Sequence, residues 1–157
     1  MRRIAFFEDA AADQLVPLAL LRPVFELMCG HFSVRERWVR FGDVCEWGAW
    51  LRPELCETYA QQHPEAHLND LGWLSSGETT FVHGRWLPGA GALPEISAGQ
   101  AGYVGDTPVS VTITPEDARK LDGGQLVDEL SRIAASRRRV ELAGTLIEYP
   151  WDLVSRN

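Results

Sequence analysis

The sequence predicts a layered α/β domain. Segments typical of strands alternate along the chain with segments of helical periodicity. A length of 157 residues suits one domain and is sufficient to bury a core. Hydrophobic residues make up 45% and charged residues 24% of the chain, which is ordinary globular composition and excludes a mainly disordered protein.

The first strand and loop are indicated by apolar runs and prolines. Residues 4–7 form a short apolar run that ends in two acidic residues, which predicts a buried strand followed by a loop. Pro17 and Pro23 interrupt the leucine-rich residues 10–31. Because proline disrupts a helix interior, this stretch predicts a loop with a helical turn or two.

Two helices are predicted from their ends. Ser33 and Glu36 match a capping box ahead of apolar residues with helical spacing, and Gly42 ends that helix. Pro53 suits the start of a second helix, which covers residues 54–62 and is stopped by a further proline.

The middle of the chain is dominated by turn residues and one strand. Residues 43–51 hold two tryptophans, Trp47 and Trp50, around Gly48, and we predict no element for them. Residues 69–70 and 75–77 have turn composition. Residues 79–87 predict a strand broken at Gly84.

The second half predicts shorter elements in alternation. They are a short helix at 93–98, a hairpin formed by 102–106 and 109–113, a capped helix that begins at 114–116, an amphipathic helix at 125–135 and a strand at 140–149.

Charge and cysteine content exclude several classes of protein. Fifteen basic and 22 acidic residues give a formal charge of -7, and a field of that sign repels the phosphate backbone of nucleic acids. Apolar runs stay far below the roughly 18 residues that a membrane span needs. Three cysteines without a CxxC pair favour reduced, largely buried thiols, and we therefore expect a cytoplasmic protein.

The loop after the first strand is the first candidate for chemistry. A glycine-rich phosphate loop would be expected there, but residues 8–14 contain three acids and three alanines instead. Two interpretations stay open: a capped loop with solvated acids, or a phosphate site bridged by magnesium. Arg22 either pairs with Glu26 or reaches back toward this loop as a phosphate clamp.

Histidine and cysteine spacing gives weaker signals. His63 and His67 have the spacing of a helical zinc pair, but a proline lies between them. Cys29 and His31 lack a visible third partner for a metal or a catalytic pair. His83, which precedes a glycine, is either a buried strand histidine or a ligand contact.

Three groups of residues follow one another along the chain in a recognisable order. They are Pro17-Leu18, Arg22-Pro23, Leu27, Gly30 and residues 34–38; then residues 81–88; then residues 148–154 with Asn157. Together they resemble the sugar nucleotidyltransferases related to the bifunctional N-acetylglucosamine-1-phosphate uridyltransferase. The first group is similar to the region that follows the first strand of that family, the second resembles its apolar-NGR-apolar-Pro segment, and the third resembles its linker to a β-helix acyltransferase domain.

The resemblance implies a fold and a reaction. The fold is a Rossmann-like three-layer domain of the nucleotide-diphospho-sugar transferase type in reduced form, with residues 1–149 as the domain and residues 150–157 as the start of a linker. The reaction is transfer of a nucleotidyl group from a nucleoside triphosphate to a sugar-1-phosphate with release of pyrophosphate. It implies a uridylyl- or thymidylyltransferase that uses Mg²⁺.

The resemblance also implies roles for individual residues. Arg22 stands near the family's sugar-phosphate-binding lysine and becomes the leading phosphate contact, and Asp9 and Asp13 become neighbours of a metal or ribose. The sugar-pocket elements are Gly84, Arg85 and His83, of which His83 stands where the family has asparagine.

The sequence leaves two other hypotheses of function open. The first is a non-catalytic binding, assembly or regulatory module that kept the fold without the glycine-rich loop, with a C-terminal acyltransferase domain or a homo-oligomer as partner. The second is a small hydrolase built around Cys29 and His31.

Overall fold

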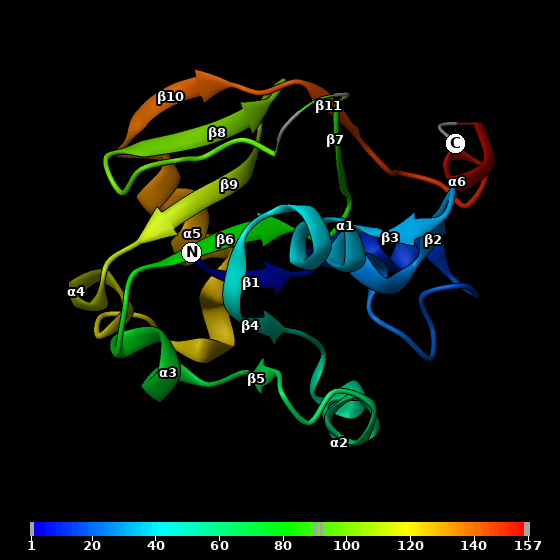
Figure 1. Ribbon diagram of the computed structural model, residues 1–157, viewed down its shortest axis with the longest axis horizontal. Coiled ribbons are helices and arrows are strands. Elements are labelled where there is room, and N and C mark those ends of the chain that lie inside the picture. Colours follow the sequence, from blue (N-terminus) through cyan, green and yellow to red (C-terminus); the bar gives the residue numbers. More distant parts are fainter. Residues whose placement is uncertain (1, 90, 92, 156–157) are drawn as a thin grey trace.

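A seven-stranded sheet forms the centre of the computed structural model, which describes residues 2–89, 91 and 93–155. The strand order is β10-β8-β9-β6-β1-β4-β5 (Figure 1). The strands are β1 (Arg2–Phe7), β4 (Val44–Trp50), β5 (His67–Leu68), β6 (Thr79–His83), β8 (Gln100–Val104), β9 (Thr107–Ile113) and β10 (Arg138–Glu141).

Strand direction brings the carboxyl ends of six strands, all except β9, to one edge of this sheet. β1 pairs in parallel with β4 and with β6, and β4 pairs in parallel with β5. β9 runs antiparallel to both of its neighbours, and β10 lies parallel to β8 at the opposite margin. The chain leaves β1 toward β4 and β5 and then returns to β6 on the other side of β1. In open α/β sheets, ligands bind beyond the carboxyl ends of the strands where the order reverses in this way.

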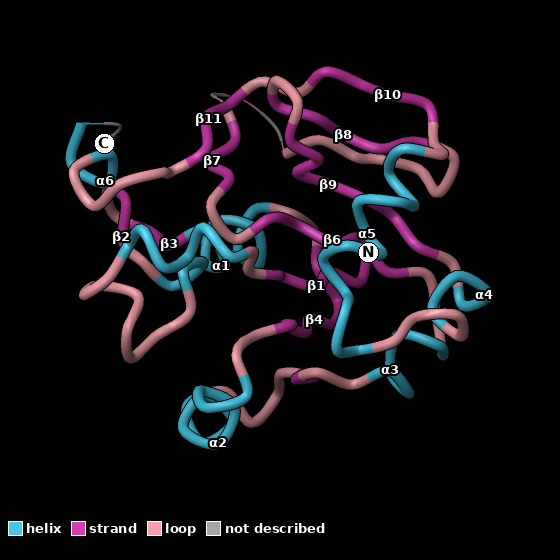
Figure 2. Tube along the Cα trace, turned by 180° about the vertical axis from the view of Figure 1, so that it is seen from behind, coloured by secondary structure: helices cyan, strands magenta, loops and turns pink. Residues whose placement is uncertain are grey.

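Helices cover both faces of the sheet, so the domain has three layers. They are α1 (Val34–Phe41), α2 (Pro53–Gln62), α3 (Leu71–Ser75), α4 (Pro115–Ala118), α5 (Leu126–Ala135) and α6 (Asp152–Ser155), with 3-10 turns η1 (Ala10–Leu15), η2 (Val24–Glu26) and η3 (Gly123–Gln125). α5 lies behind the sheet in Figure 1 and in front of it in Figure 2.

Alternation along β1 divides the core between these layers. Ile4 and Phe6 belong to one buried cluster, which includes side chains of α1 and α2. Ala5 and Phe7 belong to a second cluster with side chains of α3, α4 and α5. Successive side chains of a strand point to opposite faces, and β1 therefore anchors both halves of the core.

The predicted caps are confirmed. The Ser33 hydroxyl accepts a hydrogen bond from the Glu36 backbone, and the Glu36 carboxylate accepts one from the Ser33 backbone, at 3.2 and 2.8 Å. Gly42 ends α1, and Pro53 occupies the first turn of α2. Because these signals act within one helical turn, they can be recognised without tertiary information.

Several predicted elements differ from the structure. Residues 43–51, for which the sequence analysis predicts no element, contain the central strand β4. Residues 69–70 and 75–77 are more than turns, because α3 lies between them and Asp70 caps it. The prediction of a helix over 93–98 is wrong: residues 93–97 have no regular structure, and a turn follows at 98–99.

The strand predicted over residues 140–149 is divided. β10 joins the main sheet, whereas β11 (Gly144–Leu146) pairs antiparallel with β7 (Trp86–Pro88) in a separate ribbon. A second small ribbon joins β2 (Met28–Cys29) to β3 (Phe32–Ser33). The change of sheet follows Leu142, whose side chain lies against Gly102 of β8.

Two further properties bear on the sequence predictions. Within the described ranges, no helix has the length and apolarity that crossing a bilayer requires. The three cysteines are free, but only Cys29 is buried, while Cys45 is exposed and Cys56 is half-buried. The expectation that all three thiols are largely buried is therefore only partly met.

The capping box yields a stability prediction. Replacing Ser33 with Ala removes the acceptor for the Glu36 backbone N–H, which we expect to lower the free energy of unfolding by about 1 kcal/mol. Urea denaturation followed by circular dichroism measures this change. Ser131→Ala, an exposed change within α5, serves as the control and should stay within about 0.5 kcal/mol of the parent. Equal effects of the two changes would contradict the capping role.

Candidate active site at the carboxyl edge of the sheet

A cavity of about 410 Å³ lies beyond the carboxyl ends of β1, β4 and β5. The loop after β1 forms one wall, the segment that links β4 to α2 forms another, and η3 contributes a third. The lining residues are Glu8, Asp9, Ala10, Ala12, Asp13, Trp50, Leu51, Arg52, Pro53, Asn69, Gly123 and Gly124. We call this space the edge cavity.

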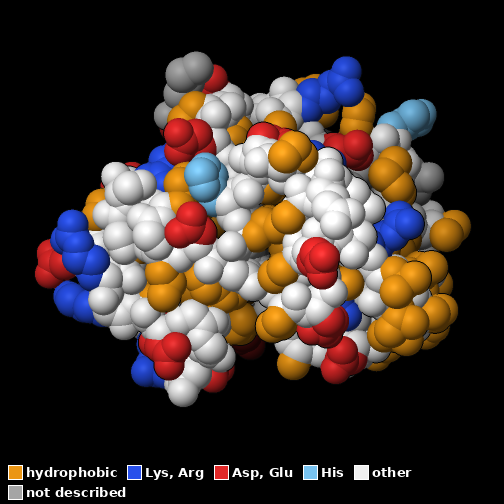
Figure 3. Space-filling model, turned by 90° about the horizontal axis from the view of Figure 1, so that it is seen from below, with side chains coloured by type: hydrophobic (Ala, Val, Ile, Leu, Met, Phe, Trp, Pro, Cys, Tyr) orange, Lys and Arg blue, Asp and Glu red, His pale blue; other side chains and the backbone are white. Residues whose placement is uncertain are grey.

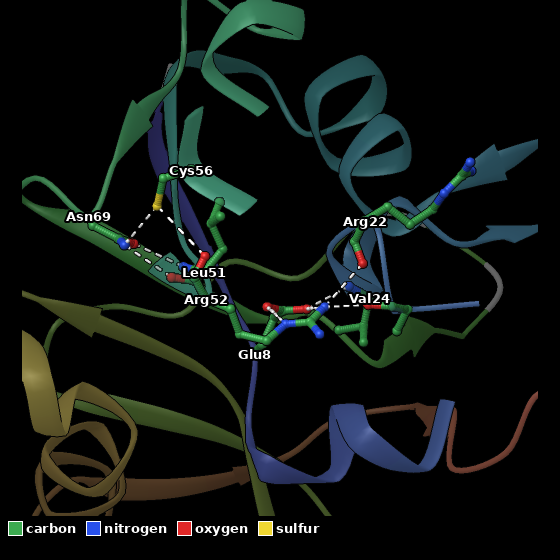
Figure 4. Close-up of polar contacts among 8 residues, drawn as sticks. Glu8, Arg22, Val24, Leu51, Arg52, Cys56 and Asn69 are labelled. Atoms are coloured by element: carbon green, nitrogen blue, oxygen red, sulfur yellow. Dashed lines mark hydrogen bonds and ion pairs between the residues drawn. The ribbon is translucent and has the colours of Figure 1, made fainter. Parts of the chain in front are cut away.

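Arg52 and Glu8 form an ion pair at the carboxyl end of β1 (Figure 4). The Arg52 Nε and Nη2 atoms lie 3.3 and 3.4 Å from the two carboxylate oxygens of Glu8, whose side chain is only 4% exposed. The same carboxylate accepts a hydrogen bond of 2.8 Å from the Val24 backbone. A carboxylate so far removed from water requires this compensation.

Arg52 also holds the segment that carries Arg22. Its Nη2 atom donates to the backbone carbonyl oxygens of Ala19 and Arg22, the latter at 3.2 Å. The link therefore joins the end of β4 to the proline-containing segment and to the loop after β1.

Asn69 fixes the neighbouring strand end. Its side-chain oxygen accepts from the Leu51 backbone at 2.9 Å, and its amide nitrogen donates to the Leu51 carbonyl at 3.0 Å. Asn69 has a positive φ of 48°, a conformation that asparagine adopts more readily than most residues. The residue just before Arg52 is thus held in place by two hydrogen bonds.

A second ionic group lies between β1 and β6, where the strand order reverses. The Arg85 guanidinium donates to both carboxylate oxygens of Asp9 at 3.0 and 2.8 Å, and His83 Nε2 lies 3.2 Å from Asp9 Oδ2. His83 Nδ1 accepts a hydrogen bond from the Arg85 backbone, so the proton of the neutral ring resides on Nε2 and faces Asp9.

The ionisation of this group follows from its surroundings. Burial alone would raise the pKa of Asp9, but hydrogen bonds from His83 and Arg85 outweigh burial and hold the pKa well below its usual range. Burial lowers the pKa of His83, and the nearby Asp9 only partly opposes this. Asp9 is therefore a carboxylate and His83 a neutral imidazole near pH 7.

Gly84 allows the protein to close tightly around these residues. A Cβ atom at this position would lie 2.9 Å from the Phe7 carbonyl oxygen and 2.9 Å from a methyl group of Val24. His83 and Arg85 are 2% and 7% exposed. Gly84, Arg85 and His83, which the sequence analysis assigned to a sugar pocket, thus lie beneath the loop after β1 and outside the lining of the edge cavity.

The Arg22 guanidinium takes a different place from the expected one. It was expected to reach back toward residues 8–14 or to pair with Glu26, but its exposed side chain extends away from Glu8 and Arg52, and only its carbonyl faces them (Figure 4). Glu26 pairs with Arg35 instead. Arg22 lines a second cavity of about 290 Å³ between η2 and α2.

The acidic residues determine what kind of metal site is feasible. Among the described residues, no group of three or more His, Cys, Asp and Glu side chains is arranged to hold a metal ion. The Asp9 and Glu8 carboxylates are occupied by arginines, whereas Asp13 lines the cavity with an exposed side chain. Mg²⁺ commonly binds one or two protein carboxylates plus substrate phosphates. Among the described acids of the edge cavity, Asp13 is thus the one whose carboxylate is not paired with an arginine.

The other histidine and cysteine candidates do not come together. His63 lies beside Glu26 and Glu65, while His67 stacks on the Trp73 ring. Cys29 is buried, whereas His31 is exposed. This arrangement gives no support to a zinc pair or to a Cys–His catalytic pair.

Arg52 and Asn69 are the residues of the site that the sequence analysis missed. Both follow strands that it did not recognise, β4 and β5, so their approach to the loop after β1 was hidden. The Arg52-Pro53 pair ahead of a recognised helix was the available signal, because the segment between a strand and a helix commonly borders a ligand site.

An exposed apolar surface lies beside the site, on the segment between η1 and η2. Large exposed hydrophobic residues gather between η1 and η2 and are Val16, Leu18, Leu20 and Leu21. Figure 3 shows apolar side chains gathered at the end of the molecule where this segment lies in Figure 1.

Comparisons with known proteins indicate a family for this chain. A family model described as sugar nucleotidyl transferase matches residues 4–157. No curated protein was found to match the sequence. A structure described as a glucose-1-phosphate thymidylyltransferase of Bacillus anthracis in complex with sucrose has a TM-score of 0.49 at 9% identity, with 92% of this chain and 88% of that chain covered. A 4-diphosphocytidyl-2C-methyl-D-erythritol synthase has a TM-score of 0.42 at 13% identity, with 99% and 96% covered.

The ionic group around Asp9 predicts how stability depends on pH. The pKa of Asp9 is lower in the folded than in the unfolded protein, so its contribution is complete above about pH 4 and is lost as the pH falls further. We expect Asp9→Asn to lower the free energy of unfolding by about 2 kcal/mol at pH 7, a value discounted because Asp9 is partly exposed.

Urea denaturation of both proteins from pH 7 to pH 2.5 measures this effect. The difference between parent and Asp9→Asn should shrink as the pH falls below 4. Glu57→Gln, on the exposed face of α2, should change stability by less than about 0.5 kcal/mol throughout. A difference that stays constant down to pH 2.5 would show that Asp9 acts by packing rather than by charge.

Proposed function

The chain belongs to the sugar nucleotidyl transferase family, and we propose that it transfers a nucleotidyl group from a nucleoside triphosphate to a sugar-1-phosphate, with release of pyrophosphate. The edge cavity is the observation that carries this proposal. It lies beyond the carboxyl ends of parallel strands, beside the point where the strand order reverses, and a guanidinium group forms part of its wall.

The reaction is an attack of a phosphate oxygen of the sugar-1-phosphate on the α-phosphorus of the triphosphate. A new P–O bond forms there, the bond between the α-phosphorus and the oxygen that bridges to the β-phosphorus breaks, and pyrophosphate leaves with the electron pair. Such a transfer depends chiefly on positioning and on neutralisation of charge. The side chains of the edge cavity would supply both.

In this proposal the triphosphate enters the edge cavity with a magnesium ion. Asp13 would hold that ion, which would neutralise part of the phosphate charge when bound. Asp9, fixed by Arg85 and His83, would place the loop after β1 near the metal or ribose. Gly84 allows close packing against Phe7, the residue at the end of β1. In this proposal His83, Gly84 and Arg85 therefore act as positioning residues for the loop after β1 and do not form a sugar pocket.

Arg22 is the proposed ligand of the sugar phosphate. Its backbone is fixed next to the edge cavity by Arg52, while its exposed guanidinium lines the cavity between η2 and α2 and points away from Glu8 and Arg52 (Figure 4). The proposal therefore requires this side chain to turn toward the edge cavity when the sugar-1-phosphate binds. An arginine on a fixed backbone with a solvent-exposed head can receive a second phosphorylated substrate without displacing buried groups.

A non-catalytic binding or assembly module is the second candidate. Three acids and one arginine line the edge cavity, and the exposed leucines between η1 and η2 present an apolar surface. A partner such as an acyltransferase domain or a second copy would then cover that surface. Calorimetry with millimolar UTP, dTTP and sugar-1-phosphates in Mg²⁺ separates the two, because a module of this kind would bind none of them.

The proposed function predicts a kinetic effect of Arg22→Ala. Loss of a charge-assisted bond to the sugar phosphate should lower kcat/KM by about tenfold or more, mainly through a higher KM for the sugar-1-phosphate. A pyrophosphate-release assay with varied sugar-1-phosphate measures this. Arg40→Gln, an exposed change on α1, should leave both constants unaltered. Unchanged efficiency of Arg22→Ala would remove Arg22 from the proposal.

A further inference from the structure

We propose that Arg52 binds the phosphates of the nucleoside triphosphate directly, as the residue that supplies positive charge to the edge cavity. This inference rests on the proposed function and deepens it. It concerns a residue that the sequence patterns did not single out and whose position becomes clear only when β4, β1 and α2 are seen together (Figure 4).

Charge is the first argument. Arg52 is the single cationic side chain in the described lining of the edge cavity, where it stands among Glu8, Asp9 and Asp13. Asp9 is already neutralised by Arg85. Arg52 is in turn paired with Glu8, so a polyanion that enters this space shares Arg52 with that carboxylate as its protein-borne counter-charge.

Hydrogen-bond capacity is the second argument. A guanidinium has five N–H donors, on Nε, Nη1 and Nη2. Glu8 and the two backbone carbonyls take up Nε and Nη2, while Nη1 donates to no group among the described residues. The side chain is 23% exposed and lines the edge cavity, so we expect Nη1 to be available to a ligand there.

Preorganisation is the third argument. Glu8 and the Ala19 and Arg22 carbonyls hold the guanidinium plane in one orientation before a ligand arrives. Little side-chain entropy is then lost when a phosphate binds. Glu8 also weakens phosphate binding, because its negative charge lies next to the proposed phosphate position and competes with the phosphate for Arg52.

These points give opposite expectations for two substitutions. Arg52→Gln removes the counter-charge, and affinity for inorganic tripolyphosphate should fall by about tenfold or more. Glu8→Gln keeps an acceptor for the Val24 N–H but removes the competing charge, and affinity for the same probe should rise several-fold. Arg119→Gln, an exposed change beyond α4, is the matched control and should alter affinity by less than about twofold.

The experiment is calorimetric titration of each protein with tripolyphosphate, UMP, UDP and UTP in Mg²⁺. A direct contact predicts that the loss caused by Arg52→Gln grows from UMP to UTP, because the phosphate chain gains charges that Arg52 would meet. Thermal unfolding of each variant is measured in parallel. Arg52→Lys keeps a charge but not the planar fork, so it should lose several-fold affinity and decides the matter if Arg52→Gln does not fold.

Each outcome has a definite meaning. Equal losses for UMP and UTP, or a loss for Glu8→Gln as large as that for Arg52→Gln, would show a purely structural link and overturn the assignment of Arg52. Unaltered tripolyphosphate affinity in Arg52→Gln or Arg52→Lys would also overturn it, while leaving the proposed function in place. A parent protein that binds none of the four probes would overturn both.

Discussion

Two adjacent carboxylates at the end of β1 impose the constraint on which the rest of this site depends. Glu8 and Asp9 follow the central strand directly, and each is paired with an arginine, the buried Glu8 at 4% exposure and the partly exposed Asp9 at 23%. Glu8 obtains Arg52 from the end of β4, whereas Asp9 obtains Arg85 from the turn after β6. The two ion pairs thus link the carboxyl ends of β1, β4 and β6. They also fix the start of the loop that follows β1.

The layered core makes this arrangement possible. β1 contributes to both hydrophobic clusters, so its end is fixed from both faces of the sheet. Side chains that follow it can then be placed to within hydrogen-bonding distance of residues from far along the chain. The walls of the edge cavity combine small residues, such as Ala10, Ala12 and Gly123, with the larger side chains of Trp50 and Arg52.

Local signals in the sequence predicted much of the fold but little of the site. The capping box at Ser33, the proline at the start of α2 and the hairpin of β8 and β9 are each determined within a few residues. β4 escaped prediction because its tryptophans lie on either side of Gly48, which lets His67 approach and breaks any simple alternation. The Arg52–Glu8 pair joins residues 44 positions apart, so no local pattern could reveal it.

The pairing of β10 with β8 has a practical consequence for how the chain can be shortened. β10 closes one margin of the large sheet, and its backbone satisfies the outer hydrogen-bonding groups of β8. A fragment that stopped before Arg138 would leave those groups open to strands of other molecules, which is how soluble domains begin to aggregate. Recombinant versions trimmed in that region would be prone to precipitate even though every residue of the edge cavity lies upstream of the cut.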